Sequence, residues 1–292
     1  LVFATSSRLF TAFLGARIAN KKKLPLYLDI RDIFVDTMTD ILSPKISWLA
    51  APVMLLIERY TFRSAKHINL VSKGFSQYFE EHYPRASFSF FTNGIDKEFL
   101  KVSPVVGMTP TGKDIVNVLY AGNIGEGQGL HLIIPELAKL LDSRVRFRII
   151  GDGGQRKKLE NAVAELSLTN VELITPVARE RLIEEYIKAD VLFLHLNDYS
   201  AFEKVLPSKL FEYAAMGKPI WAGLNGYSAH FVRSEIVGCE VFLPGNIADA
   251  IDKLDALALN VEPRVEFNRK FNRDTIMHEM ALDILRLKKH NA

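Results

Sequence analysis

The sequence has little of what marks several large classes of protein. Its 292 residues include one cysteine, Cys239, so no disulfide can form within the chain, which fits a reducing compartment. No apolar run reaches the roughly 18 to 20 residues that a membrane-spanning helix needs. The net charge of +3 at pH 7 is too small to indicate a nucleic-acid partner. We therefore expect a cytoplasmic protein that binds no nucleic acid, with Cys239 as a buried, unreactive thiol.

Common metal and phosphate motifs are missing as well. The sequence contains no GxxxxGK(S/T) phosphate loop, no HExxH motif, no Cys–His spacing typical of zinc and no Asp-x-Asp cluster at a strand end. Its seven histidines are scattered. His195, in the apolar strand FLHL, is better explained as a hydrogen-bonded core residue than as a catalytic base. The sequence therefore predicts no metal site and no bound cofactor.

What the sequence does contain is an alternation of apolar strands and helices, which predicts parallel sheets with helices on both faces. The alternation occurs twice, on either side of residues 101–113, which lack periodicity and contain Pro104 and Pro110. We interpret this stretch as an interdomain linker with a boundary near Pro110. The chain opens on a strand without a methionine, and we expect an earlier part of the natural protein to precede it. Strands are expected at 1–5, 25–30, 67–72, 87–91, 115–120, 145–150, 171–174, 190–196, 220–222 and 240–243.

Two charged residues, Arg31 and Asp32, directly follow the strand at 25–30. Side chains at the carboxyl end of a parallel strand lie where open α/β sheets bind ligands. The alternative is an Arg–Asp pair that only fixes the loop. The sequence leaves both interpretations open.

Residues 44–65 form a long helix candidate, with Pro52 as a kink or break. The helix is apolar, contains Trp48 and is flanked by lysines and arginines. One interpretation is an interfacial helix that touches anionic lipid. We favour the other, an ordinary core helix, because such helices are far commoner.

Two glycine-rich loops follow strands in the second half. Residues 122–129 read GNIGEGQG, and residues 151–154 read GDGG. The first loop is close to the dinucleotide pattern, but the acidic residue expected about twenty positions later falls at the end of a helix, so a nicotinamide site is not predicted. Glycine lets the backbone approach a ligand closely, and N–H groups of both loops are placed to face a diphosphate. The alternative is that both loops are only tight turns.

The stretch 201–223 indicates a loop, a helix and a strand. Pro207 stands at the helix start, and Gly217 is typical of a helix C-terminal cap. Ser208 and Lys209 would lie in the first turn, where N–H groups and the helix dipole favour an anion. Glu212 follows one turn later, as a carboxylate that could accept hydrogen bonds from a ribose. The alternative is a helix cap with a solvated glutamate.

Taken together, the runs PSKLFEYAAMGKPI, VLYAGNIGEGQGL, FRIIGDGGQRKKLE and FFTNGID resemble the family 4 retaining glycosyltransferases. Within these, the chain is most similar to the bacterial O-antigen and capsule group with a Pro-Ser-Lys motif. The resemblance implies the GT-B fold, which has two Rossmann-like domains whose parallel sheets face across a cleft. It also implies that the first domain lacks its opening strands. The expected division is 1–108 for this acceptor-side domain, 109–273 for the nucleotide-sugar domain, and 274–292 for a C-terminal helix that packs back on the first.

The resemblance places the donor nucleotide on the second domain. Glu212 matches the second Glu of the family's E-x7-E motif, which holds the ribose. The first Glu falls on Lys204, and Glu203 stands one residue away as a contact for the donor sugar. The loop that faces the diphosphate is implied to include Gly122 and Gly125, with Asn123 beside them and Gly151 on the next strand.

The family's basic residues for the diphosphate are replaced by Glu126 and Gln128. We expect Lys209 to supply the missing positive charge and Ser208 a hydroxyl, because both stand at a helix start. Arg31 and Asp32 fall where many members carry His-Asp, and Asp32 would orient the acceptor or act as its base.

The implied reaction moves a hexose or N-acetylhexosamine from a nucleoside-diphosphate sugar, usually UDP-linked, to a lipid-linked saccharide of a bacterial surface polysaccharide. We expect it to be independent of metal and to run in the cytoplasm, with peripheral contact at the inner membrane. Two alternatives remain. One is a GT-B nucleotide-sugar epimerase or hydrolase, and the other is a nucleotide-sugar-binding module without activity.

Overall fold

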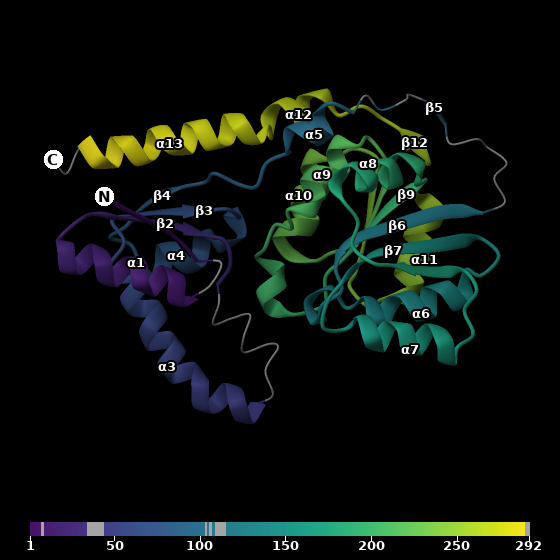
Figure 1. Ribbon diagram of the computed structural model, residues 1–292, viewed down its shortest axis with the longest axis horizontal. Helices are drawn as coiled ribbons and strands as arrows, with labels where there is room; N and C mark the ends of the chain where they lie inside the picture. Colours follow the sequence, from purple (N-terminus) through teal and green to yellow (C-terminus); the bar gives the residue numbers. More distant parts are fainter. Residues whose placement is uncertain (7–8, 34–43, 103, 105–106, 109–114, 290–292) are drawn as a thin grey trace. The chain divides into compact units, whose positions relative to one another are not determined.

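The computed structural model describes residues 1–6, 9–33, 44–102, 104, 107–108 and 115–289 (Figure 1). Two compact units divide the chain. The first consists of Leu1–Gly94, Tyr199–Leu206 and Arg273–Ala292. The second consists of Ile95–Asp198 and Pro207–Asn272. Each unit is an α/β structure built on a parallel sheet, as the alternating pattern predicts. Among the described residues, no helix has both the length and the apolarity to cross a membrane.

The first unit contains a four-stranded sheet of order β1-β2-β3-β4, in which every pair is parallel. All residues of β2 and β3 are buried, because helices and the terminal helix α13 cover the sheet. The strands are β1 Val2–Thr5, β2 Leu26–Ile30, β3 His67–Leu70 and β4 Ser87–Ser89. The helices are α1 Leu9–Lys22, α3 Pro44–Arg63, η1 Lys73–Phe75, α4 Ser76–His82, η3 Ser200–Glu203 and α13 Arg273–Lys289.

Helix α3 continues through Pro52 as one helix, so of the two effects expected at this residue, a kink or a break, the break does not occur. Its last turns pack Phe62 into the core of the unit, as a core helix would. Val53 and Leu56, however, are exposed, so α3 also presents an apolar surface. The side chain of Trp48 lies outside the described residues.

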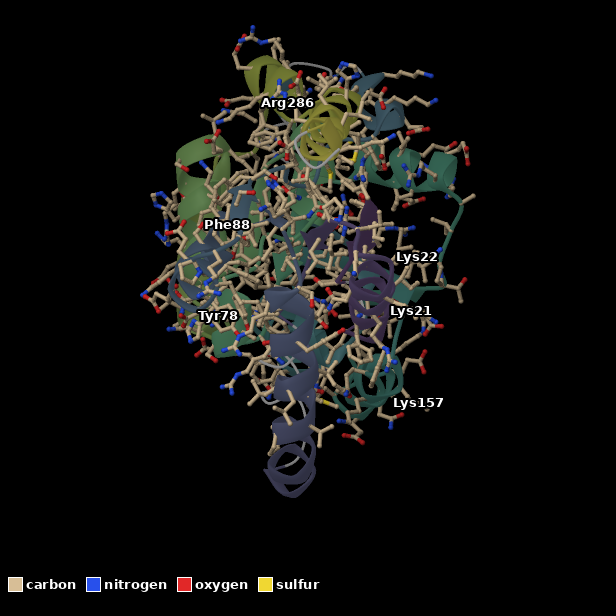
Figure 2. All side chains as sticks on the ribbon, turned by 90° about the vertical axis from the view of Figure 1, so that its left-hand side faces the viewer. Lys21, Lys22, Tyr78, Phe88, Lys157 and Arg286 are labelled. Atoms are coloured by element: carbon tan, nitrogen blue, oxygen red, sulfur yellow. The ribbon has the colours of Figure 1, made fainter. Side chains whose placement is uncertain are left out.

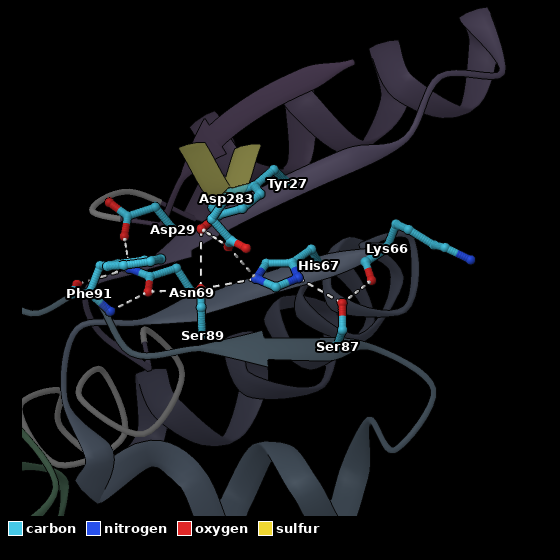
Figure 3. A network of polar contacts seen from close by, with 9 residues as sticks. All are labelled: Tyr27, Asp29, Lys66, His67, Asn69, Ser87, Ser89, Phe91 and Asp283. Atoms are coloured by element: carbon cyan, nitrogen blue, oxygen red, sulfur yellow. Dashed lines mark hydrogen bonds and ion pairs between the residues drawn. The ribbon is translucent and has the colours of Figure 1, made fainter. Parts of the chain in front are cut away.

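Helix α13 is tied to the first sheet by polar contacts of one carboxylate, Asp283 (Figure 3). Tyr27 donates its hydroxyl hydrogen to Asp283 Oδ2 at 3.1 Å, and His67 Nε2 lies 3.0 Å from the same oxygen. His67 also contacts the hydroxyls of Ser87 and Ser89, at 2.6 and 2.9 Å. Burial lowers the pKa of His67, opposed by the Asp283 carboxylate. Helix α13 therefore belongs to the first unit, although most of the second unit lies in sequence between this helix and the strands it contacts.

The second unit contains a six-stranded parallel sheet of order β11-β10-β9-β6-β7-β8. Its core gathers Phe147, Phe193, Trp221 and Phe242 between the sheet and its helices. The strands are β6 Val116–Asn123, β7 Val145–Asp152, β8 Val171–Ile174, β9 Val191–His195, β10 Ile220–Gly223 and β11 Cys239–Phe242. The helices are α5 Lys97–Leu100, η2 Glu126–Gln128, α6 Leu130–Leu140, α7 Arg156–Glu165, α8 Arg179–Lys188, α9 Lys209–Ala215, α10 Gly226–Glu235, α11 Ile247–Ala256 and α12 Val265–Lys270.

The two units meet in sequence between Gly94 and Ile95, earlier than the boundary expected near Pro110. Ile95 N–H bonds to Phe271 O at 2.8 Å, and the ring of Phe99 packs 6.0 Å from that of Tyr186. In addition, β5 Gly107–Met108 pairs antiparallel with β12 Asn260–Val261. These apolar and backbone contacts hold Ile95, Phe99 and strand β5 to the second unit, whereas composition alone says nothing about which unit a linker-like stretch packs against.

Candidate functional site

A cavity of 340 Å³ opens at the carboxyl ends of β6 and β7 in the second unit. The chain passes from β6 through β7 to β8 and then returns to β9 on the other side of β6. Such a reversal of strand order is where open α/β sheets bind ligands. The cavity is lined by Ala121, Gly122, Asn123, Ile150, Gly151, Asp152, Pro176, Val177, Leu182 and Lys209.

Two glycines let the strand ends approach one another at this cavity. Gly122 and Gly151 are partners in the β6–β7 register. A Cβ atom at Gly151 would lie 1.8 Å from the carbonyl oxygen of Gly122, so no other residue fits without moving the main chain. A Cβ atom at Gly122 would lie 3.4 Å from Cε of Lys209. The absence of a side chain at Gly151 therefore lets the two strand ends pack closely, and its absence at Gly122 leaves room for the aliphatic part of Lys209.

The first glycine loop is held by Gln128. Its Oε1 accepts hydrogen bonds from Asn123 Nδ2 at 2.9 Å and from the Gly125 N–H at 3.2 Å. Tyr120 donates its hydroxyl hydrogen to the Asn123 carbonyl at 2.6 Å. Gly122 and Asn123 thus line the cavity, whereas the N–H of Gly125 is engaged within the loop itself.

Helix α9 carries the charged pair of the site. It runs from Lys209 to Ala215, and Gly217 follows with φ +68°, so the predicted helix and its glycine cap are confirmed. Lys209 Nζ lies 3.3 Å from Glu212 Oε2, and the two side chains are 23% and 20% exposed. Ser208 precedes the helix, and its side chain makes no capping hydrogen bond.

Tyr186, on α8, is a second partner of Glu212. Its hydroxyl donates to Oε2 at 3.2 Å, and the residue is fully buried. Lys209 and Tyr186 therefore both contact Oε2 of this carboxylate, and Lys209 is the member of this group that lines the cavity.

Arg31 and Asp32 belong to the first unit, at the end of β2. Arg31 Nε forms an ion pair with Asp29 Oδ2 at 2.9 Å. This partner differs from the Arg31–Asp32 pair that we considered. The reason is that residues two apart on a strand share a face, and Asp29 is buried there. Ser6 Oγ fixes the turn, since it accepts the Arg31 N–H at 3.0 Å and donates to the Asp32 carbonyl at 3.2 Å.

Glu203 ends η3 in the first unit, where its side chain is exposed. The segment around it is fixed by Ser72 Oγ, which donates to the Lys204 carbonyl at 2.5 Å, and by Asn93 Nδ2, which lies 3.4 Å from the Leu206 carbonyl. The predicted residues therefore form two groups, one in each unit. The group in the second unit lies at the 340 Å³ cavity, which Gly122, Asn123, Gly151 and Lys209 help to line.

Sequence reasoning did not propose several residues of this cavity as ligand contacts. Asp152 ends β7, and Pro176 and Val177 follow β8. The signal that singled out Arg31, a charged residue at a strand end, applies to Asp152, whereas Pro176 and Val177 are uncharged and carried no such signal. Leu182 and Tyr186 carried no such signal, because they stand inside a helix.

His195 is a core residue, as its sequence context predicts. It is 1% exposed, and its Nδ1 lies 2.7 Å from the Gln128 carbonyl while Nε2 accepts the Gly245 N–H at 3.1 Å. Burial lowers the pKa of His195 to about 4, although the bond to Gln128 opposes this shift.

Protonation of His195 should destabilise the fold as the pH falls. The unfolded chain takes up this proton near pH 6.5, whereas the folded chain resists until about pH 4, so stability is lost across that range. We expect a contribution of about 3 kcal/mol at pH 4. Urea unfolding of the wild type and of His195→Gln between pH 4 and 7 measures it. Parallel pH profiles for the two proteins would contradict the prediction.

Among the residues that the structure describes, no three His, Cys, Asp or Glu side chains are grouped to hold a metal ion. The cavity has one cation, Lys209, and a largely apolar wall of Ile150, Pro176, Val177 and Leu182, and Lys209 is paired with the carboxylate of Glu212. These groups suit a ligand with an anionic part, hydroxyls and a flat ring.

One known protein resembles part of this chain in sequence, and solved structures resemble nearly all of it in fold. Over 108 residues it is 34% identical to WcaI of Escherichia coli K12, whose name assigns it to colanic acid biosynthesis as a glycosyl transferase. This match covers 37% of the chain and only 26% of WcaI.

Two solved structures share the fold of this chain. Sucrose-phosphate synthase from Thermosynechococcus elongatus has a TM-score of 0.77 at 16% identity, covering 99% of this chain and 73% of that one. Anabaena Alr3699/HepE, in complex with UDP, has a TM-score of 0.71 at 17% identity, covering 98% and 79%.

The expected fold class, an α/β protein of GT-B type with two parallel sheets, is confirmed by these structures. A family model described as glycosyl transferases group 1 matches residues 110–273, which is more than half of the chain and includes all six strands of the second unit's six-stranded sheet. The chain therefore belongs to the group 1 glycosyl transferases.

Proposed function

We propose that this chain takes a sugar from a UDP-linked donor and transfers it, with retention of configuration, to a lipid-linked saccharide of a bacterial surface polysaccharide. The observation that carries the donor half is the pairing of Lys209 with Glu212 at the glycine-floored cavity. UDP is favoured because Alr3699/HepE, of the same fold, holds it. The polysaccharide context is supported by the name of WcaI.

In this proposal the nucleotide lies across the ends of β6 and β7. The apolar wall formed by Pro176, Val177 and Leu182 receives the base, and Glu212 accepts hydrogen bonds from the ribose hydroxyls. Lys209 faces the diphosphate, with the backbone at Gly122 and Gly151 allowing close approach. Ser208 and Asn123 are proposed as further polar contacts of the phosphates.

The reaction breaks the bond between the anomeric carbon and the diphosphate oxygen while an acceptor hydroxyl forms the new bond on the same face. The sugar passes through an oxocarbenium-like state, and negative charge grows on the leaving diphosphate. We propose that Lys209 stabilises this charge without a metal ion. Asp32 is proposed to orient the acceptor hydroxyl or take its proton, with Arg31 beside it and Glu203 contacting the donor sugar.

A donor assay tests the proposal. The purified protein is incubated with UDP-, GDP- and ADP-sugars and a bacterial lipid extract, with and without EDTA. We expect label from a UDP-sugar in the lipid fraction, unaffected by EDTA, and weaker UDP binding by Glu212→Ala in calorimetry. Asp32→Asn should lower turnover and leave UDP affinity unchanged.

Other outcomes of the assay favour the alternatives. A changed or hydrolysed donor without acceptor would indicate an epimerase or hydrolase. UDP binding without any turnover would indicate a binding module. Loss of transfer in EDTA with recovery on adding a divalent metal would contradict the metal-independent step.

We also propose that helices α1 and α3 rest on an anionic membrane surface, on the cytoplasmic side. The helices pack together, with Asn20 Nδ2 donating to the Tyr60 hydroxyl at 2.9 Å. Their one carboxylate, Glu58, is fully buried. Their exposed apolar residues include Phe10, Leu14, Ile18, Val53 and Leu56, and their cations include Arg17, Lys21, Lys22, Arg59 and Arg63. Figure 2 labels Lys21 and Lys22 at the end of α1. Such a surface suits acidic lipid headgroups.

Vesicle sedimentation tests this contact. The protein should bind vesicles containing phosphatidylglycerol and not vesicles of phosphatidylcholine alone, and Leu56→Glu should weaken binding severalfold because it places a charge in the apolar face. Equal sedimentation with both vesicles, or no effect of Leu56→Glu, would refute the proposal.

A further inference from the structure

Tyr186 is buried where a phenylalanine would fill almost the same space. Its ring packs edge-to-face on Tyr213, at 5.5 Å between centroids, and against Phe99 at 6.0 Å. These neighbours leave the ring little freedom, so the direction of its hydroxyl is fixed. That hydroxyl points at the carboxylate of Glu212, 3.2 Å from Oε2. A rigid, dry donor is therefore aimed at the side chain assigned to the ribose.

Glu212 has two described partners, and both use the same oxygen. Tyr186 and Lys209 each contact Oε2, at 3.2 and 3.3 Å. Among the described residues, no hydrogen bond to Oε1 is found, so this oxygen is available to a ligand. The two partners are not equivalent: Lys209 lines the cavity on a flexible stem, whereas Tyr186 is enclosed. If Lys209 turns toward a diphosphate, its contact with Glu212 weakens. The hydrogen bond from Tyr186 to Glu212 does not depend on that movement.

We propose that Tyr186 is a positioning residue, which holds Glu212 by one carboxylate oxygen so that the other meets the ribose hydroxyls while Lys209 serves the diphosphate. The inference rests on the proposed donor site and adds a residue that does not touch the donor itself. Burial, together with the nearby Tyr213 and Glu212, raises the pKa of Tyr186. The hydroxyl therefore stays protonated at neutral pH and always donates to Glu212.

The test compares two ligands on one variant. Tyr186→Phe removes only the hydroxyl, and calorimetry measures its Kd for UDP and for 2′,3′-dideoxy-UDP, which lacks the ribose hydroxyls. We expect the Kd for UDP to rise about threefold to tenfold, the effect of losing one ordinary hydrogen bond, because the tyrosine acts on the ligand only through Glu212. The Kd for the dideoxy ligand should stay unchanged. Because the comparison is made within one protein, a general loss of folding would move both values together. Tyr227→Phe, on α10, is the matched control and should change neither.

A double mutant separates positioning from simple packing. In the Glu212→Ala background, Tyr186→Phe should cause no further loss of UDP affinity, since its partner is already gone. Additive losses, equal losses for both ligands, or wild-type UDP binding by Tyr186→Phe would overturn the inference. If Glu212→Ala weakens UDP binding and Tyr186→Phe does not, the inference fails while the donor site stands. If Glu212→Ala itself leaves UDP binding unchanged, the ribose assignment fails and takes the inference with it.

Discussion

Replacing Lys209 with methionine is expected to lower kcat/KM for sugar transfer by about 100- to 1000-fold, the usual result of removing one donor that stabilises developing charge. Lys209 is the only cation among the residues that line the described cavity. The loss should be mainly in kcat, because negative charge on the diphosphate is larger in the transition state than in the bound donor. Donor binding should weaken less, by about tenfold or below.

Three comparisons make this experiment specific. Lys209→Arg keeps the charge and should retain part of the activity, with geometry accounting for the remainder. Lys157→Met, on α7, removes a lysine that is 80% exposed and should leave transfer unchanged. Lys209→Met also removes one partner of Glu212, so UDP binding must be measured alongside the rate. Wild-type kcat/KM for Lys209→Met would remove this lysine from the proposed mechanism.

Gly151→Ala should strongly destabilise the second unit. The added Cβ atom would lie 1.8 Å from the Gly122 carbonyl oxygen and 3.0 Å from its carbon, and both are backbone atoms that cannot step aside alone. The strands β6 and β7 must separate at the end where their register pairs these two glycines. We expect a loss of at least about 3 kcal/mol in the free energy of unfolding.

Gly154→Ala is the matched control, because nothing lies within 4 Å of its ideal Cβ position. It should change stability by no more than about 0.5 kcal/mol. Urea unfolding of the two variants gives the comparison, and calorimetry with UDP shows whether the surviving Gly151→Ala protein has lost its cavity. Similar stabilities for the two variants would mean that the strand ends are looser than the structure indicates.

The sequence alone predicted the elements and their order well, and in places their ends. Helix α9 with its glycine cap at Gly217 follows from local signals, whereas β6 and β7 continue to Asn123 and Asp152, past the ends expected at residues 120 and 150, so that Gly122 and Gly151 lie in the strands and not in the loops. Periodicity and turn chemistry act over a few residues, so they can be recognised in a linear chain. His195 was placed correctly for the same reason, since its apolar neighbours along the strand predict burial.

Only the tertiary structure decided which of these residues meet. It paired Arg31 with Asp29, joined strand β5 to β12 of the second unit, and brought Tyr186 from α8 onto Glu212 of α9. It also placed Pro176, Val177 and Lys209 around one cavity. Contacts of this kind depend on strand order and register, which are properties of the whole sheet. A sequence pattern therefore fixes each strand and helix locally, while the packing of the sheet chooses the partners that make a site.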